Sequence, residues 1–403
     1  MTEGSLSGES RPDRGPLVGL PLLEDLPAVD GRRVLVRVDF NVPLGHGAKG
    51  EVVVEDDFRI RAALPTLSWL TDRGAEVTVC AHLGRPKGTV DARFDVAPVR
   101  ARLAELAPGV AMLDNLRFDP GEEANDCGFV ARLVQGFDAY VNDAFGASHR
   151  SHASIVGPPA RLPSAAGMLL AREVGTLGGL LVDPDRPFVA VVGGAKVGEK
   201  LGVLRALLGR VDRLIVGGGM AFTFLAARGH HVGASLLDAG RIDGCATLLE
   251  EAGDRIMLPT DFVALGPGGT LGEGDSGRGE VRMAGADLPR GWRGLDIGPE
   301  SAGEFAEVVV KARTVFWNGP MGVFEDERFA AGTRTMAMAV ADSKGFSIVG
   351  GGDSVSALDH LGLAPRVSFV STGGGASLEL LEHGDLPGLE ALRDASNAPS
   401  AGD

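Results

Sequence analysis

The sequence is poor in cysteine and contains no long apolar run, and both absences exclude classes of protein. Its three cysteines, Cys80, Cys127 and Cys245, lie far apart without a Cys-x-x-Cys spacing, which argues against a disulfide framework and against a zinc cluster. No stretch approaches the roughly 20 consecutive apolar residues that span a bilayer. The N-terminal residues 1–16 lack an apolar core and predict a disordered extension. We therefore expect a cytoplasmic protein without a membrane partner.

Positive charge is also scarce. The chain has 39 Lys and Arg against 54 Asp and Glu, a formal net charge of −15. Such an excess disfavours nucleic acid and anionic membranes as partners. A site for an anion must therefore be a local concentration of Arg, Lys and His. The length of 403 residues and the 44% hydrophobic content suit two ordinary domains.

Short apolar runs recur along the chain, and each interval leaves room for a helix. Alternating strands and helices predict an α/β fold with parallel, doubly wound sheets, whose ligands bind beyond the carboxyl ends of the strands. The expected strands are residues 34–38, 77–81, 110–113, 139–141, 188–192, 214–216, 256–258, 315–317, 347–349 and 367–370.

Proline and aspartate mark the expected seam between the two domains at residues 180–187, directly after a helix-like run over residues 165–181. We place the first domain at residues 17–179 and the second at 180–386. The tail, 387–403, either packs on the first domain, as we expect, or is loose. The glycine-rich segment 266–279 predicts a flexible surface loop.

The middle stretch, residues 188–201, is typical of a strand, a glycine turn and a helix start that carries Lys196 and Lys200. Free backbone N–H groups and the helix dipole would add to the two lysines and favour a phosphate. A phosphate loop of the Walker type is excluded because Glu199 and Lys200 replace its Lys and its Ser or Thr, and the three glycines of a dinucleotide fingerprint are missing. A plain structural turn remains the alternative.

The first half gathers basic side chains near the ends of its expected strands. Any one of them has a solvated or ion-paired alternative, but a set around one cleft would bind a small substrate with carboxylate and phosphate groups. A metal on the pair His149-x-x-His152 is disfavoured, because Arg150 lies between them and no third ligand is apparent. The set comprises Arg37, Arg59, His82, Arg85, Arg117, His149, Arg150 and His152.

The second half places glycine after its strands. Residues 350–354 and 372–377 each follow a strand and open a helix, so both are candidate phosphate cradles. Asp353 is a candidate magnesium ligand, or an N-cap. Glu325 either receives ribose hydroxyls or caps a turn. No nucleophile with an adjacent base stands out, and phosphoryl transfer does not require one. The halves therefore indicate a kinase with nucleotide on the glycine-rich half and an anionic acceptor on the basic half.

Eight short motifs occur in the order typical of one family, and the chain resembles phosphoglycerate kinases from about residue 22 to about residue 389. They are residues 36–43 (Val-Arg-Val-Asp-Phe-Asn-Val-Pro), 81–86 (Ala-His-Leu-Gly-Arg-Pro), 115–118 (Asn-Leu-Arg-Phe), 140–146 (Tyr-Val-Asn-Asp-Ala-Phe-Gly), 193–197 (Gly-Gly-Ala-Lys-Val), 217–222 (Gly-Gly-Gly-Met-Ala-Phe), 319–325 (Gly-Pro-Met-Gly-Val-Phe-Glu) and 373–377 (Gly-Gly-Gly-Ala-Ser).

The resemblance implies reversible, magnesium-dependent phosphoryl transfer between ATP and 3-phosphoglycerate, giving ADP and 1,3-bisphosphoglycerate, in glycolysis or carbon fixation. The acceptor is a carboxyl group. It implies two Rossmann-like domains, joined by a helix and a hinge, that close for direct in-line transfer. We expect a monomer.

The resemblance also assigns residues. Arg59 and Lys196 match the pair thought to stabilise the phosphoryl group in transfer, and Asp353 matches the metal position. Phosphoglycerate-binding positions are Asp39, Phe40, Asn41, Arg59, His82, Leu83, Gly84, Arg85, Arg117 and Arg150. Nucleotide-binding positions are Gly194, Ala195, Lys196, Lys200, Gly219, Asn318, Pro320, Glu325, Gly351, Gly352, Asp353 and Ser354.

Two alternatives belong to other classes. A non-catalytic binding or scaffold protein of the same family is disfavoured, because every matched basic and lysine position is retained. A nicotinamide-dependent dehydrogenase lacks its fingerprint and a placed acid near the ribose. The main departure from the family is Gly198-Glu199 where many relatives have Ser-Asp, and the longer carboxylate is expected to shift how Lys200 is held.

Overall fold

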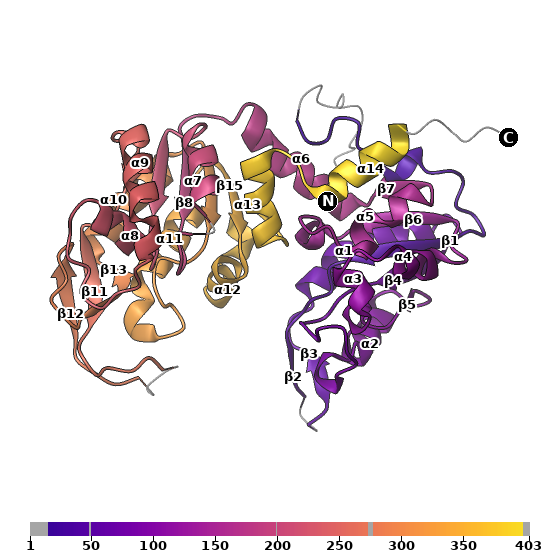
Figure 1. Ribbon diagram of the computed structural model, residues 1–403, viewed down its shortest axis with the longest axis horizontal. Coiled ribbons are helices and arrows are strands. Elements are labelled where there is room, and N and C mark those ends of the chain that lie inside the picture. Colours follow the sequence, from indigo (N-terminus) through magenta and orange to yellow (C-terminus); the bar gives the residue numbers. More distant parts are fainter. Residues whose placement is uncertain (1–14, 48–49, 199, 273–276, 398–403) are drawn as a thin grey trace. The chain divides into compact units, whose positions relative to one another are not determined.

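A computed structural model describes residues 15–47, 50–198, 200–272 and 277–397. The chain forms two compact units (Figure 1). Unit 1 comprises Met1–Val182 and His383–Asp403, and unit 2 comprises Asp183–Glu382. The expected disorder of residues 1–14 and the expected effect of Glu199 lie outside the described residues. No described helix combines the length and the apolar composition needed to cross a membrane.

Unit 1 is built on a five-stranded sheet in the order β5-β4-β1-β6-β7, in which all neighbours are parallel. In chain order this is 3-2-1-4-5, so the connections reverse direction between β1 and β6. Its strands are β1 (Arg33–Val38), β4 (Glu76–Cys80), β5 (Ala111–Met112), β6 (Ala139–Asp143) and β7 (Ser164–Ala166), with a separate hairpin of β2 (Leu44–His46) and β3 (Val52–Val54).

Helices cover both faces of this sheet because alternate residues of β1 face opposite ways. Val34, Val36 and Val38 belong to one apolar cluster, and Leu35 belongs to a second cluster with Tyr140. A strand buried on both faces is an almost continuous apolar run, as the sequence predicted. The helices are α1 (Phe58–Thr71), α2 (Ala97–Leu106), α3 (Pro120–Glu123), α4 (Cys127–Val134), α5 (Ala153–Val156), α6 (Met168–Val182) and α14 (Pro387–Asn397).

The last helix, α14, returns to unit 1, where it lies beside α5 and β7 (Figure 1). Its Gly388 N–H donates to the carbonyl of Ser148 over 2.9 Å. Arg393 donates to both carboxylate oxygens of Asp385 and, over 2.8 Å, to the carbonyl of Pro16. Pro16, which we assigned to a disordered extension, is therefore held by the C-terminal helix.

Unit 2 contains a six-stranded parallel sheet in the order β10-β9-β8-β14-β15-β16, which is 3-2-1-4-5-6 in chain order. This is the Rossmann order, and its reversal falls between β8 and β14. The strands are β8 (Phe188–Val192), β9 (Arg213–Val216), β10 (Ile256–Met257), β14 (Thr314–Asn318), β15 (Phe346–Gly350) and β16 (Phe369–Val370).

The helices of unit 2 follow these strands in alternation. Those on one face bury Val191 and Trp317 under side chains of α10 and α11, such as Phe305 and Met336. The helices are α7 (Leu201–Leu208), α8 (Ala221–Ala227), α9 (Ile242–Ala252), α10 (Pro299–Lys311), α11 (Ala331–Asp342), α12 (Gly352–His360) and α13 (Gly374–His383).

A small antiparallel sheet in unit 2 was not predicted. It consists of β11 (Asp261–Leu265) between β12 (Val281–Gly285) and β13 (Arg293–Ile297). The side chains of β12 are mostly exposed, so its sequence carries little apolar signal. The glycine-rich segment 266–279 joins β11 to β12, and Thr270 and Arg278 pair across it. Residues 273–276 of this segment lie outside the described residues.

The α/β fold and all ten expected strands are confirmed, but the helix expected over residues 165–181 was partly wrong. Ala165 and Ala166 form β7 against Val141 and Asn142 of β6, and the helix starts only at Met168. Alanine is not typical of strands, so Ala165 and Ala166 were assigned to the helix predicted by the apolar run that follows them. The hairpin β2–β3 was also missed.

Asp143 joins the end of β6 to the start of α6. Its Oδ1 accepts hydrogen bonds from the backbone N–H groups of Leu169 and Leu170, at 2.9 and 3.1 Å. Its Oδ2 is buried without a hydrogen-bond partner among the described residues. Burial raises the pKa of this carboxyl to about 6, although the Thr66 side chain and the two backbone donors act in the opposite direction.

Asp143 should therefore make unit 1 less stable as the pH rises. Because its folded pKa lies above its unfolded value, the native state binds more protons between about pH 4 and pH 6, and stability falls over that window. Asp143→Asn keeps the single accepting oxygen and removes the titration. The free energy of unfolding of the variant minus that of the parent should therefore increase by roughly 1–1.5 kcal/mol when the pH is raised from about 5 to about 8. Native-state hydrogen exchange of the β1 and β6 amides measures this.

Asp114, whose side chain is exposed at the surface of the same unit, supplies the matched control. Asp114→Asn should show the same stability difference from the parent at about pH 5 and at about pH 8, because folding does not bury its carboxyl group. An Asp143→Asn variant whose difference from the parent is equally independent of pH would contradict the assignment.

Candidate active site

In unit 1 the predicted basic residues gather at the carboxyl edge of the sheet, near the reversal between β1 and β6. Arg59 lies at the second position of α1, and Asp39 follows β1 directly. Arg59 Nη1 donates to Asp39 Oδ2 over 2.6 Å, and about a third of the Arg59 side chain is exposed. Asn41 Oδ1 accepts from the Gly84 N–H over 2.9 Å. The loop after β1 is thereby tied to α1 and to the loop after β4.

The loop after β5 is fastened by Asn115, whose side chain forms four hydrogen bonds to backbone. Its Oδ1 accepts from the N–H groups of Leu83 and Arg117, and its Nδ2 donates to the carbonyls of Leu83 and Phe94. Arg117 in turn donates to the Gly84 carbonyl over 2.7 Å and lies 3.0 Å from a carboxylate oxygen of Glu123. Gly84 has φ +61°, and a Cβ there would lie 2.2 Å from the Phe94 ring, so this close crossing requires glycine.

Arg37, on β1, is fully buried beneath these loops. Its Nε donates to Ser154 Oγ over 2.8 Å, one Nη donates to the Val38 carbonyl, and the other lies 3.0 Å from His82 Nδ1. Burial holds the pKa of His82 well below its usual value, and the positive charges of Arg37, Arg117, Arg150 and Arg59 act in the same direction. Five of the predicted basic residues thus lie close enough to affect one another.

The pair His149 and His152 does not suit a metal. Burial, followed by the charges of nearby arginines, lowers the pKa of both imidazoles, that of His152 to about 4. The same positive field would repel a cation. His152 Nδ1 lies 3.8 Å from Glu122 Oε1, and among the described residues no group of three or more His, Cys, Asp or Glu side chains could hold a metal ion.

Three predicted residues lie differently from the rest. Phe40 and Leu83 have side chains buried in the core of unit 1, so only their backbone groups remain for a ligand. Arg85 is exposed, and no ion pair connects it to another described residue. It is therefore available to an incoming anion.

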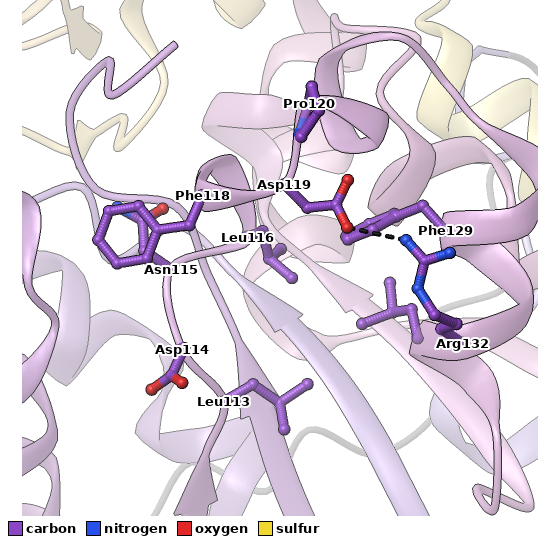
Figure 2. A pocket seen from close by; sticks show the side chains of 10 residues that line it. Leu113, Asp114, Asn115, Leu116, Phe118, Asp119, Pro120, Phe129 and Arg132 are labelled. Carbon is purple, nitrogen blue, oxygen red and sulfur yellow. Dashed lines mark hydrogen bonds and ion pairs between the residues drawn. The ribbon is translucent and has the colours of Figure 1, made fainter. Parts of the chain in front are cut away.

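A pocket of about 450 Å³ opens beside this region, where β5 ends (Figure 2). Its walls include Leu113, Phe118 and Phe129, and an ion pair of 2.8 Å between Arg132 and Asp119 borders it. Asn115, Leu116 and Phe118 of the motif at residues 115–118 line the pocket, but none of the basic residues predicted from the sequence does. The Asn115 amide is committed to backbone groups. The pocket is therefore separate from the basic residues.

In unit 2 the loops after β8, β9 and β14 interlock at the reversal of the sheet. Gly194 N–H donates to the Pro320 carbonyl, Gly218 N–H to the Met321 carbonyl, and Met220 N–H to the Gly194 carbonyl, over 3.0 to 3.2 Å. Glycine is required here, since a Cβ on Gly319 (φ +96°) would lie 2.4 Å from the Gly193 carbonyl oxygen.

The two lysines of the middle stretch differ in their surroundings. Lys200 directly precedes α7, and its Nζ donates to the Gly193 carbonyl over 2.8 Å. Lys196 and Ala195 lie in the loop before the helix, and both side chains are exposed. The helix therefore starts later than the sequence indicated, at Leu201, and leaves Lys196 on a loop.

The starts of α12 and α13 lie against each other, because a Cβ on Gly374 would be 2.5 Å from Gly351 Cα. Asn318 lies beside both and donates to the Gly374 carbonyl over 3.3 Å. Two helix N-termini that open on glycine present free N–H groups and positive dipole ends to the same space. The two segments that we expected to cradle phosphate are thus neighbours.

The polar residues around these starts divide into exposed and structural members. Asp353 and Glu325 are exposed. Asp353 is the second residue of α12, and Gly351 occupies the N-cap position, so the alternative of an Asp353 N-cap was wrong. Ser354 is buried, and its Oγ accepts the Gly319 N–H over 2.6 Å. It therefore braces the loop after β14.

Sequence reasoning missed three residues near these sites. Glu122 is fully buried and accepts hydrogen bonds from the N–H and the hydroxyl of Ser154; both residues belong to short helices without a motif. Leu236 is 57% exposed and would contact a Cβ on Gly219 at 2.9 Å. Its signal in the sequence is an apolar pair, Leu236 and Leu237, inside a polar and glycine-rich loop.

Guanidinium groups at the sheet edge of one Rossmann-like unit, and paired helix starts at the sheet edge of another, suit two phosphorylated substrates. They place the protein in the class of phosphotransferases.

Comparisons with known proteins give the family. A family model described as phosphoglycerate kinase matches residues 23–111 and 104–384. Phosphoglycerate kinase of Parafrankia sp. (strain EAN1pec) is 51% identical over 92% of this chain and 99% of its own, and that of Rubrobacter xylanophilus is 50% identical over 90% and 95%. The solved structure of phosphoglycerate kinase from Coxiella burnetii has a TM-score of 0.78 at 37% sequence identity, and the match covers 91% of this chain and 97% of that one. The solved structure from Pyrococcus horikoshii OT3 has a TM-score of 0.80 at 31% sequence identity, and the match covers 94% of this chain and 99% of that one.

The chain therefore belongs to the phosphoglycerate kinase family, as its motifs indicated. It is a kinase of this family, with the two-domain α/β fold of the solved structures, and ATP and ADP are the nucleotide substrates of the family.

The loop crossing in unit 2 predicts the effect of one methyl group. Gly319→Ala should destabilise unit 2 by more than about 2 kcal/mol and weaken ADP binding, because Ala at φ +96° would collide with the Gly193 backbone. Gly303, in α10, has no atom within 4 Å of its Cβ position, so Gly303→Ala should stabilise the helix by up to about 1 kcal/mol. Hydrogen exchange of the β8 amides measures the stability of unit 2 in both variants, and calorimetric titration measures their affinity for ADP. Equal stability and equal ADP affinity in the two variants would contradict the close contact between Gly319 and Gly193.

Proposed function

We propose that the protein catalyses reversible, magnesium-dependent phosphoryl transfer between ATP and the carboxyl group of 3-phosphoglycerate, giving ADP and 1,3-bisphosphoglycerate. The main support is that both sheet reversals carry groups suited to an anion, guanidinium groups in unit 1 and glycine-opened helix starts in unit 2. Phosphoryl transfer depends on positioning and on charge stabilisation rather than on a protein nucleophile.

Unit 1 is proposed to bind 3-phosphoglycerate. Arg forks match carboxylate and phosphate groups bidentately, and the positive field around His82 supports an anion there. Arg59, held by Asp39, is placed on the phosphoryl group in transfer. Asn41 and Gly84 supply the loop geometry, while Phe40 and Leu83 contribute by packing. The proposed ligand groups are Asp39, Asn41, Arg59, His82, Arg85, Arg117 and Arg150.

Unit 2 is proposed to bind the nucleotide. The N-termini of α12 and α13 suit phosphate groups, and exposed Leu236 beside Gly219 offers an apolar surface to a base. Glu325 is assigned to ribose hydroxyls, and Lys196 to the phosphoryl group in transfer. The other proposed positions are Gly194, Ala195, Lys200, Gly219, Asn318, Pro320, Gly351, Gly352, Asp353 and Ser354.

Asp353 is proposed to hold the magnesium ion. Magnesium takes one or two carboxylates and completes its shell with phosphate oxygens and waters. An exposed carboxylate in the first turn of α12 fits that chemistry, and so does the lack of a wider carboxylate cluster among the described residues. The ion would neutralise charge on the phosphates, while the N-termini of α12 and α13 orient them.

A coupled assay tests the function. With ATP and 3-phosphoglycerate, the protein should form 1,3-bisphosphoglycerate, which a dehydrogenase converts with oxidation of its nicotinamide cofactor. Turnover should disappear when magnesium is chelated, and Asp353→Asn should raise the magnesium concentration for half-maximal rate by at least about 10-fold. Folded protein without turnover above background would instead support a binding or scaffold role.

Arg59→Ala in the same assay should lower kcat by at least about 100-fold, because the group would act on charge that develops in the transition state. Nucleotide affinity should stay unchanged, since Arg59 belongs to unit 1. Arg61 supplies the matched control: it lies on the same helix, is exposed and pairs with Asp57. Arg61→Ala should retain kcat within a few fold, and weakened ADP binding in Arg59→Ala would contradict the assignment.

Direct transfer requires both substrates in line and shielded from water, so we also propose that the units close on a hinge and that the protein acts as a monomer in the cytoplasm, without nucleic acid or membrane as partner. The net charge of −15 supports the last point. Small-angle scattering should give the mass of one chain and a smaller radius of gyration with ADP, magnesium and 3-phosphoglycerate together than with none. Superimposable curves, or a dimer mass, would contradict these proposals.

A further inference from the structure

We infer that a buried chain of hydrogen bonds from Glu122 through Ser154 and Arg37 holds His82 as a neutral imidazole with its proton on Nε2. Glu122 and Ser154 are then positioning residues for the acceptor site. The inference deepens the proposed function, because it assigns to His82 the role of a single, fixed hydrogen-bond donor to the anionic substrate. All four hydrogen-bonded residues, Glu122, Ser154, Arg37 and His82, belong to unit 1.

This chain of hydrogen bonds is unbroken in the structure. Glu122 Oε1 accepts from the Ser154 hydroxyl over 2.6 Å, and Ser154 Oγ accepts from Arg37 Nε over 2.8 Å. Arg37 Nη2 then lies 3.0 Å from His82 Nδ1. Glu122, Ser154 and Arg37 are fully buried, and His82 is 7% exposed. Water therefore does not compete for these bonds along the chain.

The direction of the last bond fixes the tautomer. A guanidinium group has only donors, so His82 Nδ1 must accept and cannot carry a proton. The ring proton of a neutral imidazole then resides on Nε2. Among the described residues no side chain or backbone group accepts from that nitrogen. Nε2–H is therefore the polar group that His82 can offer to a ligand.

The surroundings keep the ring neutral. Burial is the largest cause that lowers the pKa of His82, and Arg37 on β1, Arg117 after β5, Arg150 after β6 and Arg59 on α1 add to it. A second ring proton would also face Arg37 donor to donor. Binding through His82 should therefore not change as the pH passes the usual pKa of histidine, which is near 6.5.

Glu122 stabilises the far end of the chain. A buried guanidinium group without a countercharge is strongly unfavourable, and Glu122 is the fully buried carboxylate linked to Arg37 through a single hydroxyl. The hydroxyl sets the orientation of Arg37 because it bonds Nε, while Nη2 is left to face His82. Loss of the Ser154 hydroxyl should free the guanidinium group to rotate.

Nitrogen-15 NMR of histidine-labelled protein tests the inference directly, with His82→Gln to assign the signal. The parent should show an unprotonated Nδ1 and a protonated Nε2 for His82, without titration between about pH 5 and pH 8. A protonated Nδ1, or a normal titration of His82, would overturn the inference. This readout does not depend on turnover.

Ser154→Ala tests the positioning role. The KM for 3-phosphoglycerate should rise roughly 3–10-fold, as expected for one lost or misoriented hydrogen bond, with a smaller change in kcat, and the His82 signal should become a mixture of tautomers. Tyr140→Phe is the matched control, because the Tyr140 hydroxyl donates to the carbonyl of Ser154, not to its side chain. It should leave the His82 signal and this KM unchanged.

Further outcomes distinguish the inference about the His82 tautomer and its positioning residues from the proposed placement of His82 at the substrate. A Ser154→Ala variant with the spectrum and the KM of the parent would overturn the positioning role. If Ser154→Ala fails to fold, Glu122→Gln, which keeps one oxygen to accept from the Ser154 hydroxyl, takes its place, and the spectrum of the parent still decides the tautomer. An unchanged KM in His82→Gln would contradict the placement of His82 at the substrate, while leaving the tautomer assignment intact.

Discussion

Each unit depends on the pairing of its first sheet strand with its fourth, β1 with β6 and β8 with β14. Because connections leave these central strands in opposite directions, the loops at their carboxyl ends diverge and leave room for a ligand. In unit 1 the register pairs Arg37 with Asn142, which sets the buried guanidinium group directly below the loops after β1 and β6. In unit 2 it pairs Val192 with Asn318, so that the two glycine loops cross. One rule of sheet topology thus positions two chemically different sites.

Much of the fold could be predicted because parallel strands buried on both faces leave apolar runs that stand out from the helices. The short strand β7 and the exposed strand β12 lacked that signal: the first owes its conformation to pairing with β6, and the second to pairing with β11. The motif residues were identified by the order of eight short segments. Glu122 and Ser154 were not, because their roles arise from contacts between segments 32 residues apart, which no local pattern records.

Buried carboxyl groups are accommodated in two ways. In unit 1, Arg37 and Glu122 compensate each other through a hydroxyl, while Arg59 pairs with Asp39 and Arg117 with Glu123. In unit 2, Asp296 is buried, accepts the N–H groups of Gly332 and Ile297, and has a pKa raised to about 7 by burial. A carboxyl of this kind avoids the cost of a buried charge by taking up a proton. Burial raises the pKa of Asp143 in unit 1 in the same way, whereas Arg37 and Glu122 lie beside the proposed acceptor site as a linked pair of opposite charge.

The return of α14 to unit 1 has a consequence for biosynthesis. Unit 2 is an insertion in unit 1, since Asp183–Glu382 lies between the two segments that form the other unit. A ribosome that releases the chain from its N-terminus completes unit 2 before α14 emerges. The surface of unit 1 that α14 covers stays exposed until Leu389 and Leu392 have left the exit tunnel. Both side chains are buried in the finished protein. The order of synthesis therefore makes α14, which is translated after the whole of unit 2, complete the domain that was begun first.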